Sequence, residues 1–254
     1  LMRMTYLAHA GLLGEAAGTR IVMDPWRYGP AQYHSWWHFP PLPTSPWNDL
    51  EPIDVVMISH VHDDHFHLPS LQRLPKTATA VIPYQLDPWM AQTLRRLGFA
   101  QVVELEHGRR YELRPGLWVK NFQCGRIDSA YWLKDRTGTL LNLNDCPVSL
   151  PWLRNWLRHD PPPDVVFSAF SYASPYPICY DVEGLGCDEL VAESKRRILD
   201  QFAATMATLQ PRYAVPFATQ YAFLLPEQVW MNRHLPTPPE AAQAVVARTS
   251  EVQA

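Results

Sequence analysis

Cysteine, excess basic charge and long apolar runs are all scarce in this sequence. Its 254 residues include four cysteines, and 22 lysines and arginines stand against 25 acidic residues, which gives a net charge of −3. No apolar stretch approaches the roughly 20 residues that a membrane-spanning helix needs. A basic face, the usual requirement for binding nucleic acid, is not indicated by this balance. We therefore expect neither a membrane span nor a nucleic-acid partner.

The few cysteines are scattered rather than paired. Cys124, Cys146, Cys179 and Cys187 form no C-x-x-C motif. In a chain of this length, such spacing favours reduced thiols over a disulfide framework. The first residues, 1–6, have no long apolar run behind them of the kind found in a signal peptide. Together these features predict a cytoplasmic protein.

Proline and tryptophan are abundant, with 25 and 10 residues respectively. Residues 27–52 are rich in proline and aromatic side chains and show almost no periodicity, which predicts a long ordered loop. Loops of this length in compact domains are usually functional. We expect a substrate pocket between aromatic residues of this loop and of a second loop, 168–177. The aromatic and histidine candidates are Tyr28, Tyr33, His34, Trp36, Trp37 and His38 on one wall, and Phe170, Tyr172 and Tyr176 on the other.

Short apolar runs alternate with amphipathic segments along the rest of the chain. Residues 4–26 are predicted to form a hairpin that turns near Gly14 and Gly18. No repeat or low-complexity linker interrupts the pattern, so a single domain over 1–254 is expected, with a tail at 235–254 that is partly frayed. Further strands are predicted at 55–58, 80–83, 102–105, 117–120, 130–133, 139–143, 165–167 and 214–217, and helices at 68–74, 89–97 and 189–209.

The densest group of metal-binding residue types is the run His60-Val61-His62-Asp63-Asp64-His65. It begins directly at the end of the predicted strand 55–58. His60 and His62 are two residues apart, so their side chains point the same way in an extended segment. Asp64 and His65 follow where the chain must turn, and they can face a second ion about 3.5–4 Å away. This pattern predicts a two-metal site, in preference to a polar loop that merely holds three histidines.

The segment Ser59–His65 resembles the H-x-H-x-D-H signature of the metallo-β-lactamase fold superfamily. Residues 6–11 and 22–26 are similar to the opening hairpin of that superfamily. The resemblance implies an α/β fold of the αββα type, in which two mixed sheets are flanked by helices and the metals lie at one edge.

Several blocks are also similar to the metallo-β-lactamase-like domain of CMP-N-acetylneuraminate hydroxylase and to its bacterial di-iron monooxygenase relatives. That hydroxylase also has a Rieske iron–sulfur domain, and this sequence contains no Cys-x-His…Cys-x-x-His pair to bind such a cluster. The similar blocks are 24–26 with 29–30 and 36–37, 58–65 with 68–71, 141–142 with 145–146, and 209–212 with 216–218.

The resemblance implies the remaining metal ligands. Asp145 matches the carboxylate that bridges the two metals. The third ligand of the first metal is expected between 120 and 130, where no histidine occurs, and Asp128 is preferred over Cys124 because it matches an acidic residue of the sialic-acid enzyme. The predicted metal ligands are thus His60, His62, Asp64, His65, Asp145 and Asp128.

A last histidine on the second metal is expected near Ala218 and is absent. Gln220, His38 or water are the alternatives for that place. His9 and Asp24 are expected beneath the metals, where they would hydrogen-bond to the ligands and fix their tautomers.

Replacing imidazoles with carboxylates makes a more oxygen-rich metal pair, of the kind that suits iron and manganese. With the hydroxylase resemblance, this implies an O2-dependent di-iron monooxygenase that hydroxylates a small organic substrate, with a place in specialised metabolism. It would use two iron ions (alternatively zinc or manganese), O2 as co-substrate, and an external ferredoxin or reductase as electron donor. The alternatives are a dinuclear zinc or manganese hydrolase of a lactone, thioester or phosphodiester, and a metal-bearing scaffold without turnover.

Overall fold

Three antiparallel strands open the chain, which in this computed structural model is described for residues 2–42, 52–171, 178–179, 187–249 and 252–253. These are β1 (Arg3–Ala8), β2 (Gly11–Ala16) and β3 (Thr19–Met23). The predicted hairpin is therefore a three-stranded meander. Gly14 lies inside β2, opposite Met4 and Ile21, and not in a turn. Gly18 does lie in the β2–β3 turn, with a φ of 73° that glycine adopts without strain.

The first sheet continues from β3 through parallel strands, in the order β1-β2-β3-β5-β6-β7. The parallel strands are β5 (Val55–Met57), β6 (Thr79–Pro83) and β7 (Gln101–Leu105). β5 and β6 are buried along their whole length, as expected for parallel strands covered on both faces. Helices α1 (Leu68–Leu71) and α2 (Trp89–Arg96) supply part of the apolar cluster that covers the outer face.

The second sheet has the order β13-β12-β11-β10-β9-β8, antiparallel from β8 to β11 and parallel from there to β13. Helices α3 (Leu150–Leu157), α4 (Cys187–Leu209) and α5 (Pro238–Arg248) contribute to the apolar cluster on its outer face. Its strands are β8 (Arg110–Arg114), β9 (Leu117–Cys124), β10 (Asp128–Lys134), β11 (Thr139–Asn142), β12 (Val165–Ala169) and β13 (Tyr213–Phe217).

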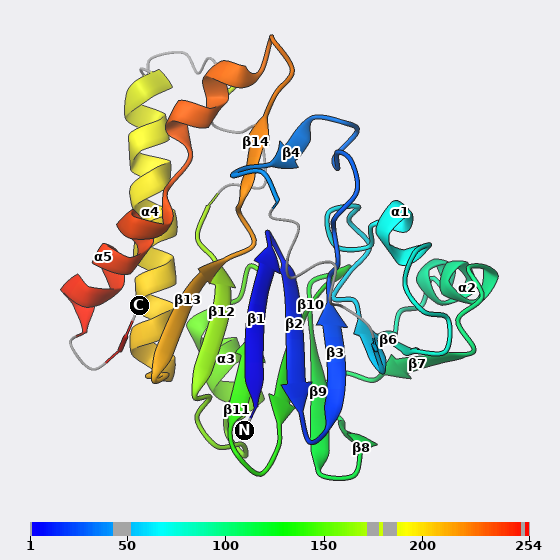
Figure 1. Ribbon diagram of the computed structural model, residues 1–254. Helices are drawn as coiled ribbons and strands as arrows, with labels where there is room; N and C mark the ends of the chain where they lie inside the picture. The colour runs from blue at the N-terminus through cyan, green and yellow to red at the C-terminus, as the bar shows by residue number, and fades with distance from the viewer. Residues whose placement is uncertain (1, 43–51, 172–177, 180–186, 250–251, 254) are drawn as a thin grey trace.

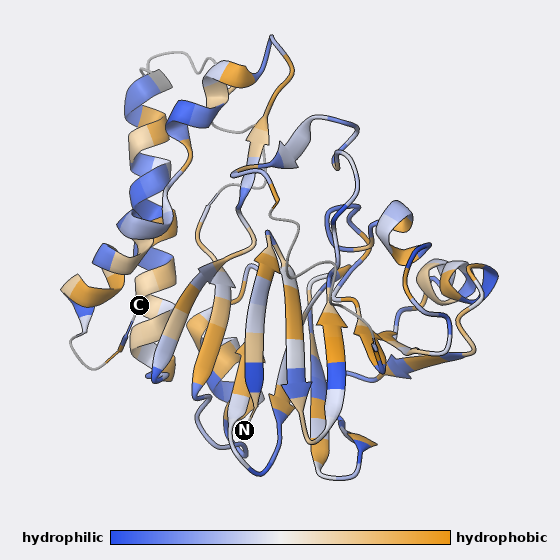
Figure 2. Cartoon of the chain, in the orientation of Figure 1, coloured by the Kyte–Doolittle hydropathy of each residue, from blue (hydrophilic) through white to orange (hydrophobic). Residues whose placement is uncertain are grey.

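A third apolar cluster fills the space between the two sheets, with Leu12 and Met57 from the first and Tyr131 and Phe217 from the second. Hydrophobic residues are concentrated in the strands of both sheets (Figure 2). Helices α1 and α2 lie on one side of the sandwich, and α4 and α5 on the other (Figure 1). The predicted αββα arrangement of two mixed sheets flanked by helices is confirmed. Within the described ranges, no helix combines the length and the hydropathy needed to cross a membrane.

The proline-rich loop contributes a small two-stranded sheet beyond the sandwich edge. Strand β4 (Trp36–His38) pairs with β14 (Tyr221–Phe223), and both lie above the upper edge of the sheets in Figure 1. Trp36 is buried and its ring stacks on Tyr221 with centroids 3.8 Å apart. Trp36 therefore packs inside this subassembly.

Of the opposite aromatic wall, the structure describes Phe170 alone. Phe170 is buried in the core, 6.3 Å from Phe202 of α4 between ring centroids, so it packs a helix against the second sheet. Tyr172 and Tyr176 lie outside the described residues.

The C-terminal segment contains a helix where we expected a frayed tail. In α5, Ala241 and Val245 are buried against α4. This burial offsets the conformational entropy that the segment loses when it forms a helix. A capping box starts the helix: Glu240 accepts hydrogen bonds from the backbone N and the Oγ1 of Thr237, at 2.7 and 2.9 Å. Lys195 of α4 lies 2.7 Å from the same carboxylate. The alanine-rich composition that suggested fraying is in fact helix-forming.

Glu240→Ala is expected to lower the free energy of unfolding by about 1 kcal/mol, the usual effect of losing a cap. The ion pair with Lys195 adds little because both groups are partly exposed. Urea unfolding followed by circular dichroism measures the change. Glu240→Gln keeps the hydrogen-bond acceptor and is the control, with a smaller expected loss; equal losses in the two variants would contradict the capping role.

Candidate metal centre

The run 60–65 leaves the first sheet at the end of β5 and is held by the second sheet. Ser129 Oγ donates to the carbonyl oxygen of Ser59 at 2.6 Å, and the hydroxyl of Tyr131 donates to that of Ile58 at 2.8 Å. Ser129 and Tyr131 are both buried in β10. Two buried hydrogen bonds between the sheets thus fix the backbone from which the histidines project.

A first group of donor atoms forms around His60, which is fully buried. Its Nε2 lies 2.9 Å from Nδ1 of His62 and 3.8 Å from Oδ1 of Asp128. It also lies 3.7 Å from Oδ2 of Asp145. His60, His62 and Asp128 each offer one ligand atom within 4.8 Å of the others. The structure therefore brings together two histidines of one loop with a carboxylate at the start of β10.

A second group forms around His65. Its Nε2 lies 3.2 Å from Oδ2 of Asp64 and 3.7 Å from Oδ1 of Asp145. His9, in the turn between β1 and β2, places its Nε2 2.8 Å from the same Asp64 oxygen. Gln32 Nε2 donates to the other Asp64 oxygen at 2.6 Å. Both Asp64 oxygens are thus engaged, with Oδ2 facing the imidazoles.

Asp145 lies between the two groups, with Oδ2 toward His60 and Oδ1 toward His65. It follows β11 after Asn144, whose left-handed backbone (φ 52°) turns the chain at this point. Asparagine tolerates that conformation better than most residues. Two hydrogen bonds hold Asn144 in place: its backbone N donates to Asn142 Oδ1, and its Nδ2 donates to the Ser129 carbonyl oxygen. One carboxylate can therefore reach both groups at once.

Asp24 orients the histidines from below. It is fully buried at the end of β3, and its Oδ1 accepts from the backbone N of Ser59 at 2.7 Å. Its Oδ2 accepts from Ser59 Oγ at 2.6 Å and lies 3.0 Å from Nδ1 of His65. Ser59 Oγ in turn lies 2.9 Å from Nδ1 of His60. These contacts place Nδ1–H of both rings against acceptors, so each Nε2 lone pair can face the group of donors.

The pKa shifts show how closely the charges are packed. Burial lowers the pKa of His60 to about 4, and His65 acts in the same direction. Burial alone would lower the pKa of His65, but the carboxylates of Asp64 and Asp145 raise it well above its ordinary value. Burial raises the pKa of Asp128, and the neighbouring Asp145 raises it further. A divalent cation would offset this crowding of carboxylates.

Unpaired oxygens provide a direct test of whether metal ions fit here. Oδ1 of Asp128 and Oδ1 of Asp145 are buried atoms for which the described residues supply no hydrogen-bond partner. Leaving such oxygens unpaired costs free energy that a cation would recover. Both face imidazole nitrogens of His60 or His65 at 3.7–3.8 Å. The donor set, with its mixture of imidazoles and carboxylates, fits two divalent ions.

The alternatives left open by the sequence lie elsewhere. Cys124 belongs to no potential metal group among the described residues; it is buried, and a hydrogen bond with the Cys146 thiol lowers its pKa. Gln220 Oε1 accepts from the hydroxyl of Tyr6. The ring of His38 packs on Trp26 with centroids 3.9 Å apart. The structure thus groups Asp128, and not Cys124, with the histidines.

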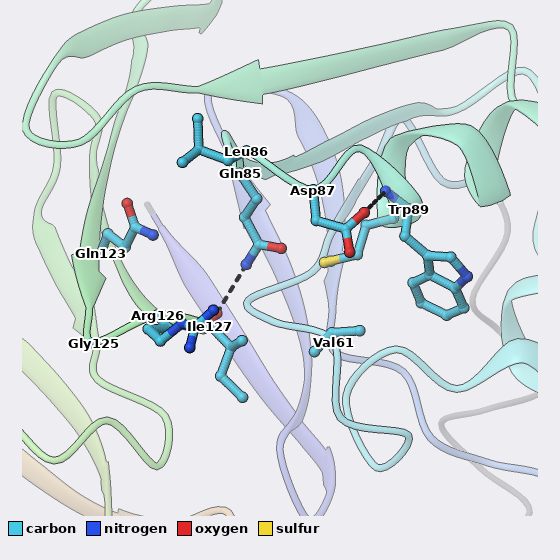
Figure 3. Close-up of a pocket in the computed structure, with 10 residues that line it drawn as sticks. Val61, Gln85, Leu86, Asp87, Trp89, Gln123, Gly125, Arg126 and Ile127 are labelled. Carbon is cyan, nitrogen blue, oxygen red and sulfur yellow. Dashed lines mark hydrogen bonds between the residues drawn. The ribbon is translucent and has the colours of Figure 1, made fainter.

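A hollow of about 540 Å³ opens beside the first group. Val61 separates His60 from His62, and Ile127 precedes Asp128, so the hollow shares two lining segments with that group. The amide of Gln85 donates to the carbonyl oxygen of Ile127 at 3.0 Å and joins the two sides (Figure 3). The lining residues are Val61, Gln85, Leu86, Asp87, Trp89, Met90, Gln123, Gly125, Arg126 and Ile127.

Sequence reasoning missed Gln32, whereas the expected contact of His9 with a predicted ligand is present, at 2.8 Å from Asp64. Gln32 sits in the irregular loop, and no motif marks it; its backbone N also donates to both oxygens of Asp63, at 2.9 and 2.8 Å. The Nε2 of His9 also joins Asp64 and His65 in a third group of potential ligand atoms. The one available signal for His9 was its place in the hairpin that resembles the superfamily's.

Comparison with known proteins agrees with this fold. A family model for the beta-lactamase superfamily domain matches residues 3–129. The chain belongs to the beta-lactamase superfamily. Among solved structures, this superfamily member matches CmlA, a diiron beta-hydroxylase from Streptomyces venezuelae, with a TM-score of 0.56, 19% identity, and coverage of 86% of this chain and 45% of that chain. An isothiocyanate hydrolase from Delia radicum gut bacteria matches with a TM-score of 0.63, 18% identity, and coverage of 96% and 91%. Such low identities support the shared fold alone.

The predicted resemblance to CMP-N-acetylneuraminate hydroxylase is also confirmed. The mouse enzyme is 25% identical over 268 residues, covering 99% of this chain and 45% of its own length. A candidate Rieske 2Fe-2S iron-sulfur protein of Mycobacterium tuberculosis (strain ATCC 25618 / H37Rv) is 31% identical over 242 residues, covering 91% of this superfamily member and 46% of its own length. The chain thus spans slightly less than half the length of these curated relatives.

Proposed function

We propose that this chain is a dinuclear non-haem iron monooxygenase that hydroxylates a small organic substrate. The observation that carries the proposal is the composition of the donor groups. Three carboxylates, Asp64, Asp128 and Asp145, accompany the histidines, and Asp145 faces both groups. Oxygen-rich sets of this kind suit iron or manganese, whereas zinc prefers nitrogen and sulfur ligands. The similarity to the diiron beta-hydroxylase and to the sialic-acid hydroxylase supports the same choice.

The residues of the chain would divide the work as follows. His60, His62 and Asp128 would hold the first ion, Asp64 and His65 the second, and Asp145 both. Two ferrous ions would supply activation of dioxygen. One oxygen atom would enter the substrate and the other would leave as water, with two electrons coming from a ferredoxin or reductase and two protons from solvent. None of these proposed ligands is a thiolate.

The protein itself would orient the ligands and the substrate. Ser59 contacts Nδ1 of His60, and Asp24 contacts Nδ1 of His65. These contacts keep the proton of each ring on Nδ1 and would leave Nε2 free to bind a metal ion. We place the substrate in the hollow beside the first group, since its walls include residues adjacent to His60, His62 and Asp128. Arg126, which is exposed there, is positioned to meet an anionic group of the substrate.

Reconstitution with iron tests this function. We expect the metal-free protein to bind two ferrous ions per chain under anaerobic conditions, and to consume O2 in proportion to an added reductant, with a change in its visible spectrum. The same chain loaded with zinc is the control and should not consume O2. Two tightly bound zinc ions with hydrolysis of a lactone, thioester or phosphodiester, and no oxygen-dependent change with iron, would refute the proposal in favour of a hydrolase.

A further inference from the structure

The second donor group has fewer protein ligands than the first in the assignment above. His60, His62 and Asp128 serve the first group, and only Asp64 and His65 serve the second, with Asp145 shared between them. Another donor close to Asp64 and His65 would make the two sites equal in protein ligands.

His9 is placed where that donor is needed. Its Nε2 is 2.8 Å from Asp64 Oδ2, which is itself 3.2 Å from Nε2 of His65. All three ligand atoms lie within 4.8 Å of one another. Ligands on one ion, with bonds of about 2.0–2.2 Å, are roughly 2.8–3.5 Å apart. The two measured separations fall in this range.

The backbone at His9 indicates that its position is enforced. His9 has a φ of 50°, in the left-handed region that residues other than glycine rarely adopt. Such conformations persist where surrounding structure imposes them, and they concentrate at functional sites. The His9 carbonyl oxygen accepts from the N of Ala218 at 3.0 Å. The ring is enclosed edge-on by Trp26 and Tyr221, at 5.3 and 5.8 Å between centroids.

Nε2 is the His9 ring nitrogen for which the described residues supply a polar contact. The side chain is 1% exposed, and Nδ1 finds no hydrogen-bond partner among the residues that the structure describes. Of the rivals for this place, Gln220 accepts a hydrogen bond from Tyr6, and His38 belongs to no potential metal group among the described residues.

We propose that His9 is a direct ligand of the second metal ion, through Nε2. This inference rests on the two-metal site of the proposed function and is independent of whether that site performs oxygen chemistry. His9 would therefore act together with Asp64, His65 and Asp145, so that each ion has four protein ligands. The strained turn between β1 and β2 exists, on this account, to deliver one imidazole to the edge of the sheets.

Cobalt binding to the metal-free protein tests the proposal. Asn tolerates the left-handed backbone, and its side chain is too short to reach the place of Nε2. We expect His9→Asn to bind one Co²⁺ per chain where the unaltered protein binds two, with more than about a 100-fold loss of affinity at the second site. The visible absorption of the second cobalt ion should disappear. In His9→Gly, which relieves the backbone strain, added imidazole should restore the second ion and its spectrum.

His67→Asn is the matched control. His67 is also buried, at 3% exposure, but its Nδ1 contacts Ser70 Oγ and not a donor group. The His67→Asn variant should bind two Co²⁺ ions with an unaltered spectrum. The proposal is overturned if His9→Asn binds two cobalt ions with unaltered affinity and spectrum. It is also overturned if His9→Gly is folded, as judged by near-ultraviolet circular dichroism, but does not regain the second ion when imidazole is added. If the unaltered protein binds fewer than two cobalt ions, the two-metal site itself is wrong.

Discussion

Asp145→Ala is expected to remove both metal ions from the chain. Its two oxygens face different groups, with Oδ2 3.7 Å from His60 Nε2 and Oδ1 3.7 Å from His65 Nε2. No other carboxylate among the described residues is in both positions. Loss of an outer partner of a metal ligand already weakens binding about 10- to 100-fold, so loss of a shared ligand should exceed 100-fold at each site. The proposed hydroxylase activity uses both ions, so it should fall below detection.

Metal analysis of the purified variant and titration with Fe²⁺ or Co²⁺ measure this effect. Asp63→Ala is the matched control, because Asp63 lies in the same histidine run but is exposed, and its carboxylate accepts from the backbone of Gln32. It should keep two ions. If Asp145→Ala retains one ion at full affinity, Asp145 serves a single site, and the shared arrangement is incorrect.

The part of this centre that could be predicted from the sequence is the part that is local. His60, His62, Asp64 and His65 are within six residues of one another, directly after a buried strand, so their proximity follows from chain connectivity. The two mixed sheets with flanking helices followed from the resemblance carried by the same residues. Both the superfamily and the fold were thus predicted correctly.

Contacts between distant segments were harder to predict. Asp128 and Asp145 were predicted as ligands because similar proteins have carboxylates at the matching positions. Their own spacing in the sequence does not indicate that they lie close to His60. The choice between Asp128 and Cys124 depends on the edge of the second sheet: these residues pair across the β9–β10 turn, yet only Asp128 reaches the donor group. Which of the two side chains reaches the histidines depends on how the two sheets pack, and the sequence pattern does not indicate this.

Irregular segments account for the remaining errors. No periodicity in the proline-rich loop predicted that β4 pairs with β14 from far along the chain, or that Trp36 is buried by that pairing. The contact of Gln32 with Asp64 similarly depends on a loop whose course no periodicity describes. The hollow beside the first group is lined by Val61, by the segment before α2 and the first turn of that helix, and by residues at and beside the β9–β10 turn.

Asp24→Asn is expected to weaken metal binding about 10- to 100-fold at both sites although Asp24 is expected to bind no metal. Asp24 offers only acceptors to three donors: the N of Ser59, the Oγ of Ser59 and Nδ1 of His65. An asparagine amide has one acceptor and one donor end. In either orientation, its NH2 group faces at least one of these donors. Asparagine also tolerates the left-handed backbone at this position (φ 40°), so the fold should survive.

The physical cause of the loss would be the tautomer of the histidines. When the amide NH2 faces Nδ1 of His65, that nitrogen must act as the acceptor, and the ring proton moves to Nε2, the atom needed for the metal. Ser59 Oγ transmits the same change to His60 through its 2.9 Å contact with Nδ1. Removing charge-assisted hydrogen bonds should also lower the free energy of unfolding of the metal-free protein by about 1.5–3 kcal/mol.

Asp135→Asn separates these two effects. Asp135 is also buried, and its Oδ1 accepts from the backbone N of Thr137 and Gly138 in the turn after β10. The variant should lose stability but bind metal normally, whereas Asp24→Asn should lose both. Isothermal titration with Co²⁺ and urea unfolding of the metal-free proteins give the two quantities. Unaltered cobalt affinity in a folded Asp24→Asn would show that the tautomers of His60 and His65 do not depend on this carboxylate.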